Sequence, residues 1–228
     1  MEALILYFVL FFPNVQFSPV IHDGIPYAQT LPFSTVRELM RLLTYTLPAI
    51  ALLLYLIAGR NRNAELKAPY SEEAPRFYKT LFPCKQDIIP FAIGLPALVI
   101  IGLSVSFLIS LSTLNFTPVR IGGPYNFFAW IAMIFACLGT GYLEEIYFRY
   151  YLLSKTKNII PNTAVRVVFS TLLFSISHIH DGPWGVLNAA IAGLILSGIF
   201  LRYRSLHGVA LAHAGYNMFV YTMGAIQG

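Results

Sequence analysis

Charged residues and cysteines are scarce in this 228-residue chain. Asp, Glu, Lys and Arg together make up 11% of the residues, and the two cysteines are Cys84 and Cys137. An ordinary soluble domain carries about 25% charged residues, so this composition excludes that class. Two distant cysteines without metal-ligand spacing indicate neither a disulfide framework nor a zinc motif.

Several motifs of large function classes are also missing from the sequence. We find no internal repeat, no phosphate-binding glycine loop and no nucleophile elbow. No series of short alternating segments indicates a membrane β-barrel. The net charge of +5 is not accompanied by an aromatic–basic RNA motif. We therefore expect no nucleic-acid partner.

Apolar residues, by contrast, form 57% of the chain, with 18 Phe and 14 Tyr among them. Several apolar stretches are about 20 residues long, enough to cross a hydrocarbon core of about 30 Å as a helix. Lipid offers the backbone no hydrogen-bond partners, so we predict an all-α fold, a polytopic transmembrane bundle of about seven spans. The predicted spans are residues 3–20, 40–59, 88–111, 126–152, 163–180, 185–202 and 206–225.

The spans predict one integral membrane domain over residues 1–228. The hydrophilic segment 60–87 is too short to be a separate domain. The first span contains Pro13 and Asn14 and has some features of a signal peptide. It lacks a basic n-region, however, so we expect it to be retained.

Basic residues predict the orientation, because cytoplasmic loops are enriched in Lys and Arg. Three loops on one side carry Arg60, Arg62, Lys67, Arg76, Lys79, Lys85, Lys155, Lys157, Arg166, Arg202 and Arg204, and the other side carries Arg37, Arg41 and Arg120. The N-terminus is therefore expected in the cytoplasm and the C-terminus outside. Membrane lipids are the expected partners of the basic loops.

Three charged residues fall inside the fourth span: Glu144, Glu145 and Arg149. A charge at the bilayer centre costs about 3 kcal/mol, so these side chains are expected to face the protein interior. Glu145 and Arg149 are four residues apart and can form an ion pair. Glu144 points about 100° away, toward different surroundings, where a desolvated carboxylate suits a general base. A purely structural ion cluster is the alternative.

Two further residue pairs, each with a histidine, lie in later spans. Phe174 and His178 share a helical face, and so do His213 and Asn217. An imidazole and a carboxamide side by side provide two donors of the kind that stabilise an oxyanion, although such a pair also serves as an interhelical clamp. His207 is expected at the membrane interface.

Taken in order, Glu144-Glu145-x-x-x-Arg149, Phe174-x-x-x-His178 and His213-x-x-x-Asn217 resemble the three motifs of the CAAX prenyl endopeptidase and bacteriocin-processing (CPBP) family. The resemblance covers about residues 125–222, the expected catalytic core, and leaves residues 1–124 as variable N-terminal spans. It implies an intramembrane endopeptidase of the glutamic type, with a catalytic cavity inside the bundle that opens toward the cytoplasm.

The resemblance also implies a role for each motif residue. Glu144 would activate the hydrolytic water with help from His178, and His213 with Asn217 would stabilise the tetrahedral oxyanion. Glu145 and Arg149 would support them.

No cofactor is favoured. Zinc held by Glu144, His178 and His213 is the alternative, because one carboxylate and two histidines leave an open position for water. The absence of a His-Glu-x-x-His segment and the poor ligand quality of Asn217 favour the metal-free reading.

The expected substrate is a protein or peptide, and the sequence leaves open whether it is lipid-modified or membrane-anchored. A prokaryotic cytoplasmic membrane is the expected location, with the endoplasmic reticulum as alternative. Two other functions stay open. One is a non-catalytic immunity or scaffold protein on the same fold, and the other is an ion- or proton-coupled transporter.

Overall fold

The computed structural model describes residues 2–11, 30–31, 33–65, 83–111, 120–153 and 156–227. Nearly all of them are helical, which confirms the predicted all-α bundle. The helices are α1 (Glu2–Leu10), α2 (Thr35–Arg41), η2 (Leu42–Thr46), α3 (Leu47–Glu65), η4 (Lys85–Asp87), α4 (Ile88–Leu111), α5 (Phe127–Glu145), η5 (Ile146–Leu152), η6 (Thr156–Asn158), α7 (Thr163–Ile176), η7 (Ile179–Asp181), α8 (Gly182–Tyr203) and α9 (Leu206–Gln227). The strands β1 (Thr30–Leu31) and β2 (Arg120–Ile121) add one short parallel pairing.

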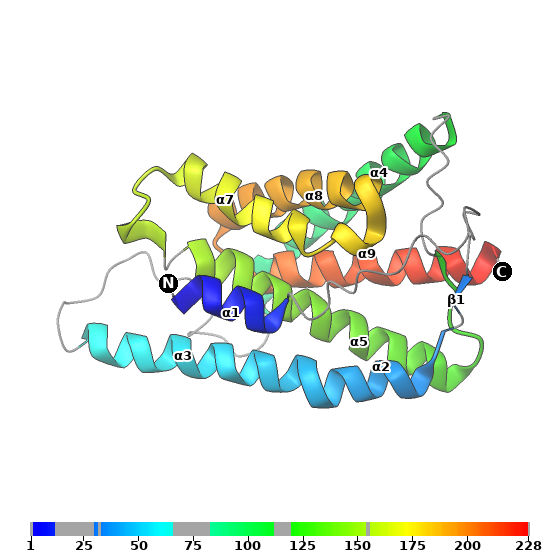
Figure 1. The fold of residues 1–228 in the computed structure, drawn as a ribbon, viewed down its shortest axis with the longest axis horizontal. Coiled ribbons are helices and arrows are strands. Elements are labelled where there is room, and N and C mark those ends of the chain that lie inside the picture. The colour runs from blue at the N-terminus through cyan, green and yellow to red at the C-terminus, as the bar shows by residue number, and fades with distance from the viewer. Residues whose placement is uncertain are drawn as a thin grey trace.

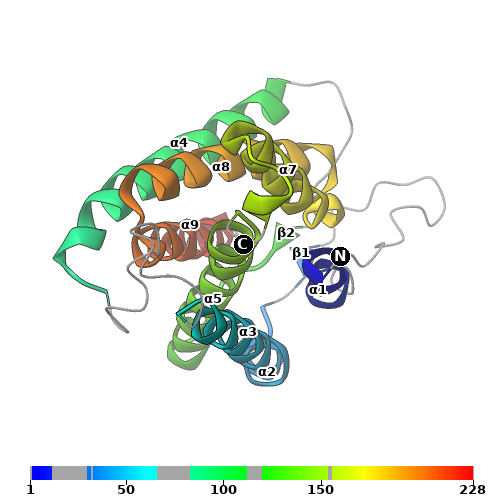
Figure 2. The ribbon, with the colours of Figure 1, turned by 90° about the vertical axis from the view of Figure 1, so that its left-hand side faces the viewer.

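The helices pack as a bundle around α5 and α9. Helices α2, η2 and α3 continue one another as a long rod below α5 (Figure 1). Seen along the bundle, α5 and α9 lie between this rod and a layer formed by α4, α8 and α7 (Figure 2). The two chain ends lie at opposite ends of the bundle (Figure 1).

Four helical segments in the described part of the chain are long and apolar enough to cross a membrane, compared with about seven predicted spans. They are Thr35–Ala58, Lys85–Leu111, Phe127–Leu152 and Ile179–Tyr203. Helix α7 has 14 residues, because it ends at Ile176 rather than near residue 180 as predicted. Helix α9 has 22 residues but is less apolar, since it carries His207, His213 and Asn217. Of the predicted span 3–20, residues 12–20 lie outside the described residues.

Two glycines allow α5 to pack closely against neighbours on two sides. A Cβ atom on Gly141 would lie 2.8 Å from the carbonyl oxygen of Ala210 and 3.0 Å from the nitrogen of Ala214. A Cβ atom on Gly139 would lie 2.6 Å from Leu42. Close approach of membrane helices at small residues is a common packing mode. Gly141 thus lets α5 lie against the backbone of α9 beside His213.

Hydrogen bonds fix the beginning of α9. Ser205, which precedes the helix, accepts a hydrogen bond from the backbone nitrogen of Gly208 at 2.9 Å and donates one to Asp87 at 2.5 Å. His207 is buried, and its Nδ1 lies 2.8 Å from the hydroxyl of Tyr142 on α5. His207 thus joins α9 to α5, and its predicted place at the membrane interface stays a prediction.

Helix α1 is attached to η5 and α7 through tyrosine hydroxyls. Tyr7 donates to the carbonyl oxygen of Leu173 at 2.9 Å, and Tyr147 donates to that of Ala3 at 2.5 Å. Tyr151 donates to the Glu2 carboxylate at 2.5 Å. The N-terminal helix is thus bonded directly to the segment that follows the two glutamates.

Candidate active site

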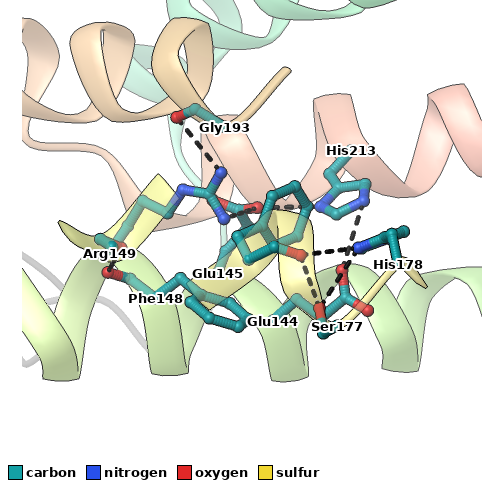
Figure 3. Close-up of polar contacts among 10 residues, drawn as sticks. Glu144, Glu145, Phe148, Arg149, Ser177, His178, Gly193 and His213 are labelled. Atoms are coloured by element: carbon teal, nitrogen blue, oxygen red, sulfur yellow. Dashed lines mark hydrogen bonds and ion pairs between the residues drawn. The ribbon is translucent and has the colours of Figure 1, made fainter. Parts of the chain in front are cut away.

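The three polar motifs come from three parts of the bundle. Glu144 and Glu145 are the last two residues of α5, and Arg149 lies in η5 directly after them. His213 is in the second turn of α9, and His178 lies just beyond the end of α7 (Figure 3).

Glu145 is the centre of a buried charge cluster. Its Oε1 accepts a hydrogen bond from Nδ1 of His213 at 2.8 Å and lies 3.0 Å from Nη1 of Arg149. The Arg149 contact has the distance of an ion pair but not the alignment of a hydrogen bond. All three side chains are buried, and the predicted ion pair between Glu145 and Arg149 is confirmed.

The Arg149 guanidinium has further contacts that explain how it is accommodated. It lies 4.5 Å above the centre of the Phe174 ring, a cation–π contact. Its Nη2 donates to the carbonyl oxygen of Gly193 on α8 at 3.4 Å. A buried cation needs such partners, because desolvation without them is costly. Arg149 thus connects η5 with α7 and α8.

Arg149 stands in a π-helical segment, which the sequence did not predict. η5 covers Ile146–Leu152, and π-helical turns occur often at functional sites. Within it, the carbonyl oxygen of Phe148 accepts a hydrogen bond from the Ser170 hydroxyl at 2.9 Å. The Ser170 side chain on α7 therefore gives this main-chain carbonyl oxygen a partner in the segment where the helix changes from α to π.

Glu144 approaches the same histidine from the other side. Its Oε2 lies 3.5 Å from Nε2 of His213 (Figure 3). The prediction that Glu144 and Glu145 serve separate surroundings is therefore wrong, because one imidazole ring reaches both carboxylates. A separation of 3.5 Å is too long for a strong hydrogen bond. Oε2 of Glu144 is buried without a hydrogen-bond partner among the described residues, so it can accept one from a bound molecule.

The net charge of the buried cluster bears on whether His213 carries one proton or two. Two carboxylates and one guanidinium leave one negative charge in a buried place, and an unbalanced buried charge is unfavourable. A second proton on His213 would make the cluster neutral. Its Nε2 would then be a donor directed toward Glu144.

His178 has a defined tautomer in this geometry. Its Nδ1 lies 2.9 Å from the carbonyl oxygen of Phe174, and a carbonyl oxygen only accepts hydrogen bonds. Nδ1 therefore carries the proton, and Nε2 of the neutral ring keeps a free electron pair. The Phe174 ring lies 4.7 Å from the His178 ring and 5.8 Å from the His213 ring, so both imidazoles flank one aromatic side chain.

Asn217 is less closely connected than the other motif residues. It lies one turn after His213 on α9, is half-buried, and has no side-chain hydrogen bond to any residue that the structure describes. The structure thus brings together Glu144, Glu145, Arg149 and His213, and links His178 to them through Phe174. It does not join Asn217 to this cluster.

The described residues around Glu144 and His213 do not form a set of zinc ligands. In the described part of the chain, no three His, Cys, Asp or Glu side chains are arranged to hold one metal ion. Glu144, His178 and His213 therefore do not fit a zinc ion in this arrangement. Cys84 and Cys137 are both free thiols.

Sequence reasoning missed one buried carboxylate near this site. Glu38 on α2 is 4% exposed and pairs with Arg37 and Arg41. The predicted span began at residue 40, which left Glu38 outside the membrane. The spacing of Arg37, Glu38 and Arg41 within one helical turn was the signal that could have revealed it.

Comparison with known proteins identifies one family. The family described as "Type II CAAX prenyl endopeptidase Rce1-like" matches residues 126–219, which include all the motif residues. A comparison with curated proteins and one with solved structures each gave no match. Together with its long apolar helices, the family match makes the chain an integral membrane protein. The match over residues 126–219 supports the resemblance of this segment to the CAAX prenyl endopeptidase and bacteriocin-processing family of membrane proteases.

Proposed function

We propose that this protein is a multi-pass, metal-independent intramembrane endopeptidase that hydrolyses a peptide bond near the membrane interface, in substrates with a CAAX-like C-terminus. The observation that carries the proposal is the placement of His213 between the carboxylates of Glu144 and Glu145. This is an arrangement in which one carboxylate orients an imidazole and the other is free to take part in proton transfer.

The reaction begins with a water molecule held by Glu144 and His178. Oε2 of Glu144 accepts one proton of the water, while Nε2 of His178 accepts a hydrogen bond from the other. The water oxygen then attacks the carbonyl carbon of the scissile bond. A buried carboxylate is suited to this step because it is not stabilised by solvent.

The resulting oxyanion needs donors. His213, held by Glu145 through Nδ1, offers its Nε2 proton, and the Asn217 carboxamide offers a second donor from the next turn of α9. When the tetrahedral intermediate collapses, the carbon–nitrogen bond breaks and Glu144 returns its proton to the leaving amine. The oxygen of the water thus becomes part of the new carboxyl group, and the proton that Glu144 took from it becomes part of the new amine.

Glu145 and Arg149 act on this reaction through His213. The carboxylate fixes which nitrogen of the imidazole faces Glu144, as a third group does in other acid–base constellations. Arg149 holds the Glu145 carboxylate in place and offsets its charge. We place the enzyme in a prokaryotic cytoplasmic membrane, with the reaction reached from the cytoplasm.

The proposal is tested with purified protein in detergent and a synthetic peptide that carries a farnesylated cysteine followed by three apolar residues. Wild-type protein should release the last three residues, whereas Glu144→Gln should release none. The same cleavage by both proteins would remove Glu144 from the mechanism. A wild-type protein that cleaves no such peptide, farnesylated or not, would favour the scaffold or transporter alternatives.

Metal dependence is tested in the same assay. Protein treated with a strong chelator and then desalted should keep its activity. Loss of activity that zinc restores would overturn the metal-free mechanism.

A further inference from the structure

A second charged cluster lies beside α5, one helical turn from Glu144. Glu38 on α2 is buried, and its carboxylate lies 3.4 Å from Nε of Arg37 and 3.2 Å from Nη2 of Arg41. Nη2 of Arg41 also donates to the hydroxyl of Thr140 on α5 at 3.3 Å. The cluster thus joins α2 to α5, which lies within the family match over residues 126–219.

The charges of this cluster do not balance. Glu38 is the acidic partner of both guanidinium groups, so one positive charge is left over among the described side chains. The Arg37 and Arg41 side chains are 49% and 45% exposed, whereas that of Glu38 is 5% exposed. Within the described residues, Nε and Nη1 of Arg41 have no partner. The Arg41 side chain is therefore partly exposed at the protein surface, with donors free to bind an anionic group.

The position of Arg41 relates it to the proposed reaction. Thr140 and Glu144 are four residues apart on α5, so their side chains lie on one face of the helix, about 6 Å apart along its axis. The Arg41 guanidinium contacts the Thr140 hydroxyl, which places it within roughly 10 Å of the carboxylate of Glu144. Each residue of an extended peptide covers about 3.3–3.6 Å. Two or three residues therefore span this distance.

The chemistry of the guanidinium indicates which kind of ligand Arg41 binds. Arginine presents its donors as a planar fork that matches a carboxylate bidentately. A substrate cut close to its C-terminus ends in such a group. From the unbalanced charge, the exposure and this spacing, we infer that Arg41, positioned by Glu38 and assisted by Arg37, binds the C-terminal carboxylate of the substrate two or three residues beyond the scissile bond.

This inference rests on the proposed function, since it names the part of the substrate that the site recognises. It explains how cleavage would occur at a fixed distance from a free C-terminus. Glu38 is a positioning residue in this scheme, because it holds Arg41 against α5 without touching the substrate.

Binding is measured apart from cleavage, in the Glu144→Gln background. Two fluorescent peptides are compared, identical except that one ends in a free carboxylate and the other in a carboxamide. Without Arg41 substitution, the carboxylate peptide should bind about 10- to 100-fold more tightly, the range of a charge-assisted contact. In the Arg41→Gln variant the carboxylate peptide should bind as weakly as the carboxamide peptide. Arg41→Lys, which keeps the charge but loses the fork, should be intermediate.

The matched control is Arg202→Gln, which removes an exposed arginine from the last turn of α8. It should keep the full preference for the carboxylate. Equal binding of the two peptides before Arg41 is changed would overturn the inference. A preference that survives Arg41→Gln would overturn it too. If Arg41→Gln weakens both peptides equally, the arginine contacts lipid phosphate or supports the fold, and the inference also fails.

The cleavage assay separates this result from the proposed function. Wild-type protein that cleaves both peptides with equal kcat/KM supports the protease function and contradicts the carboxylate site. Protein that shows the binding preference but cleaves neither peptide supports the carboxylate site and contradicts the protease function.

Discussion

His213 is the residue through which the two glutamates of α5 act on each other. Its Nδ1 contacts Glu145 at 2.8 Å and its Nε2 faces Glu144 at 3.5 Å. Adjacent residues on a helix point in different directions, so a flat ring on a neighbouring helix is needed to reach both. The imidazole therefore contacts both carboxylates, so a change in the charge of one carboxylate can affect the other through the ring.

Neutral substitutions of the two glutamates should have different effects. Glu144→Gln should abolish turnover, because an amide cannot take a proton from water, and should leave the unfolding temperature unchanged. Glu145→Gln should lower both kcat and the unfolding temperature, since it removes the counter-ion of buried Arg149. Turnover and thermal unfolding in the same detergent measure both. Equal loss of stability in the two variants would contradict the division of roles.

Replacement of Arg149 should mainly affect folding. Arg149→Ala leaves the Glu145 carboxylate buried without its cation, and breaking a buried pair costs about 3–5 kcal/mol. We expect less folded protein in the membrane and a lower unfolding temperature. Arg202→Ala, at an exposed arginine, is the control and should match wild type. A stable, active Arg149→Ala protein would show that the pair contributes little.

Packing of whole helices decides whether these side chains can meet. The hydrogen bond between Tyr142 and His207 and the close approach at Gly141 both join α5 to α9. His213 lies next to Ala214, which Gly141 contacts. The distance between the histidine and the glutamates is therefore set by the crossing of two helices.

A larger residue at this crossing should separate the two helices. Gly141→Val places side-chain atoms against the backbone of Ala210, and overpacking of this kind costs about 1–3 kcal/mol. Activity should fall at least about 100-fold, because a displacement of 1 Å in a site has an effect of that size. Gly198→Ala is the matched control, since no atom lies within 4 Å of the added carbon. If both variants keep wild-type activity, the crossing does not set the geometry.

The helices and the Glu145–Arg149 pair were predictable, because apolar length and a four-residue spacing are local properties of the sequence. The meeting of Glu144 with His213 was not, since it depends on how α5 crosses α9. The early end of α7 was missed because no glycine or proline marks a stop between Ile176 and Gly182. The partner of buried His207 is Tyr142, which is distant in the chain, so composition does not reveal it. The ion pairs of Glu38 are local, and they were missed because the predicted span began at residue 40.

At the scale of the whole molecule, the predicted orientation stays to be tested. Figure 1 places the N-terminus and the end of α3 at one end of the bundle and the C-terminus at the other, as the distribution of basic residues requires. The native Cys84 is a useful probe, since it precedes α4 and is partly exposed.

In a Cys137→Ala background, Cys84 should react with a membrane-impermeant thiol reagent only from the cytoplasmic side. A cysteine introduced by Gly228→Cys should react only from the opposite side. Labelling of inside-out and right-side-out vesicles measures both. Reaction of both cysteines from one side would contradict the odd number of crossings.

The attachment of α1 by three tyrosine hydroxyls, with the main-chain pairing of β1 and β2, has a consequence for chain continuity. Helices that are each stable in lipid associate through their side chains, so the peptide link between them is dispensable. Fragments 1–74 and 75–228, made as separate polypeptides in one cell, should therefore assemble into an active complex. An affinity tag on the first should recover the second, and replacing Tyr7, Tyr147 and Tyr151 with Phe should reduce that recovery. Without such recovery, the connection through residues 66–82 would itself be needed for assembly.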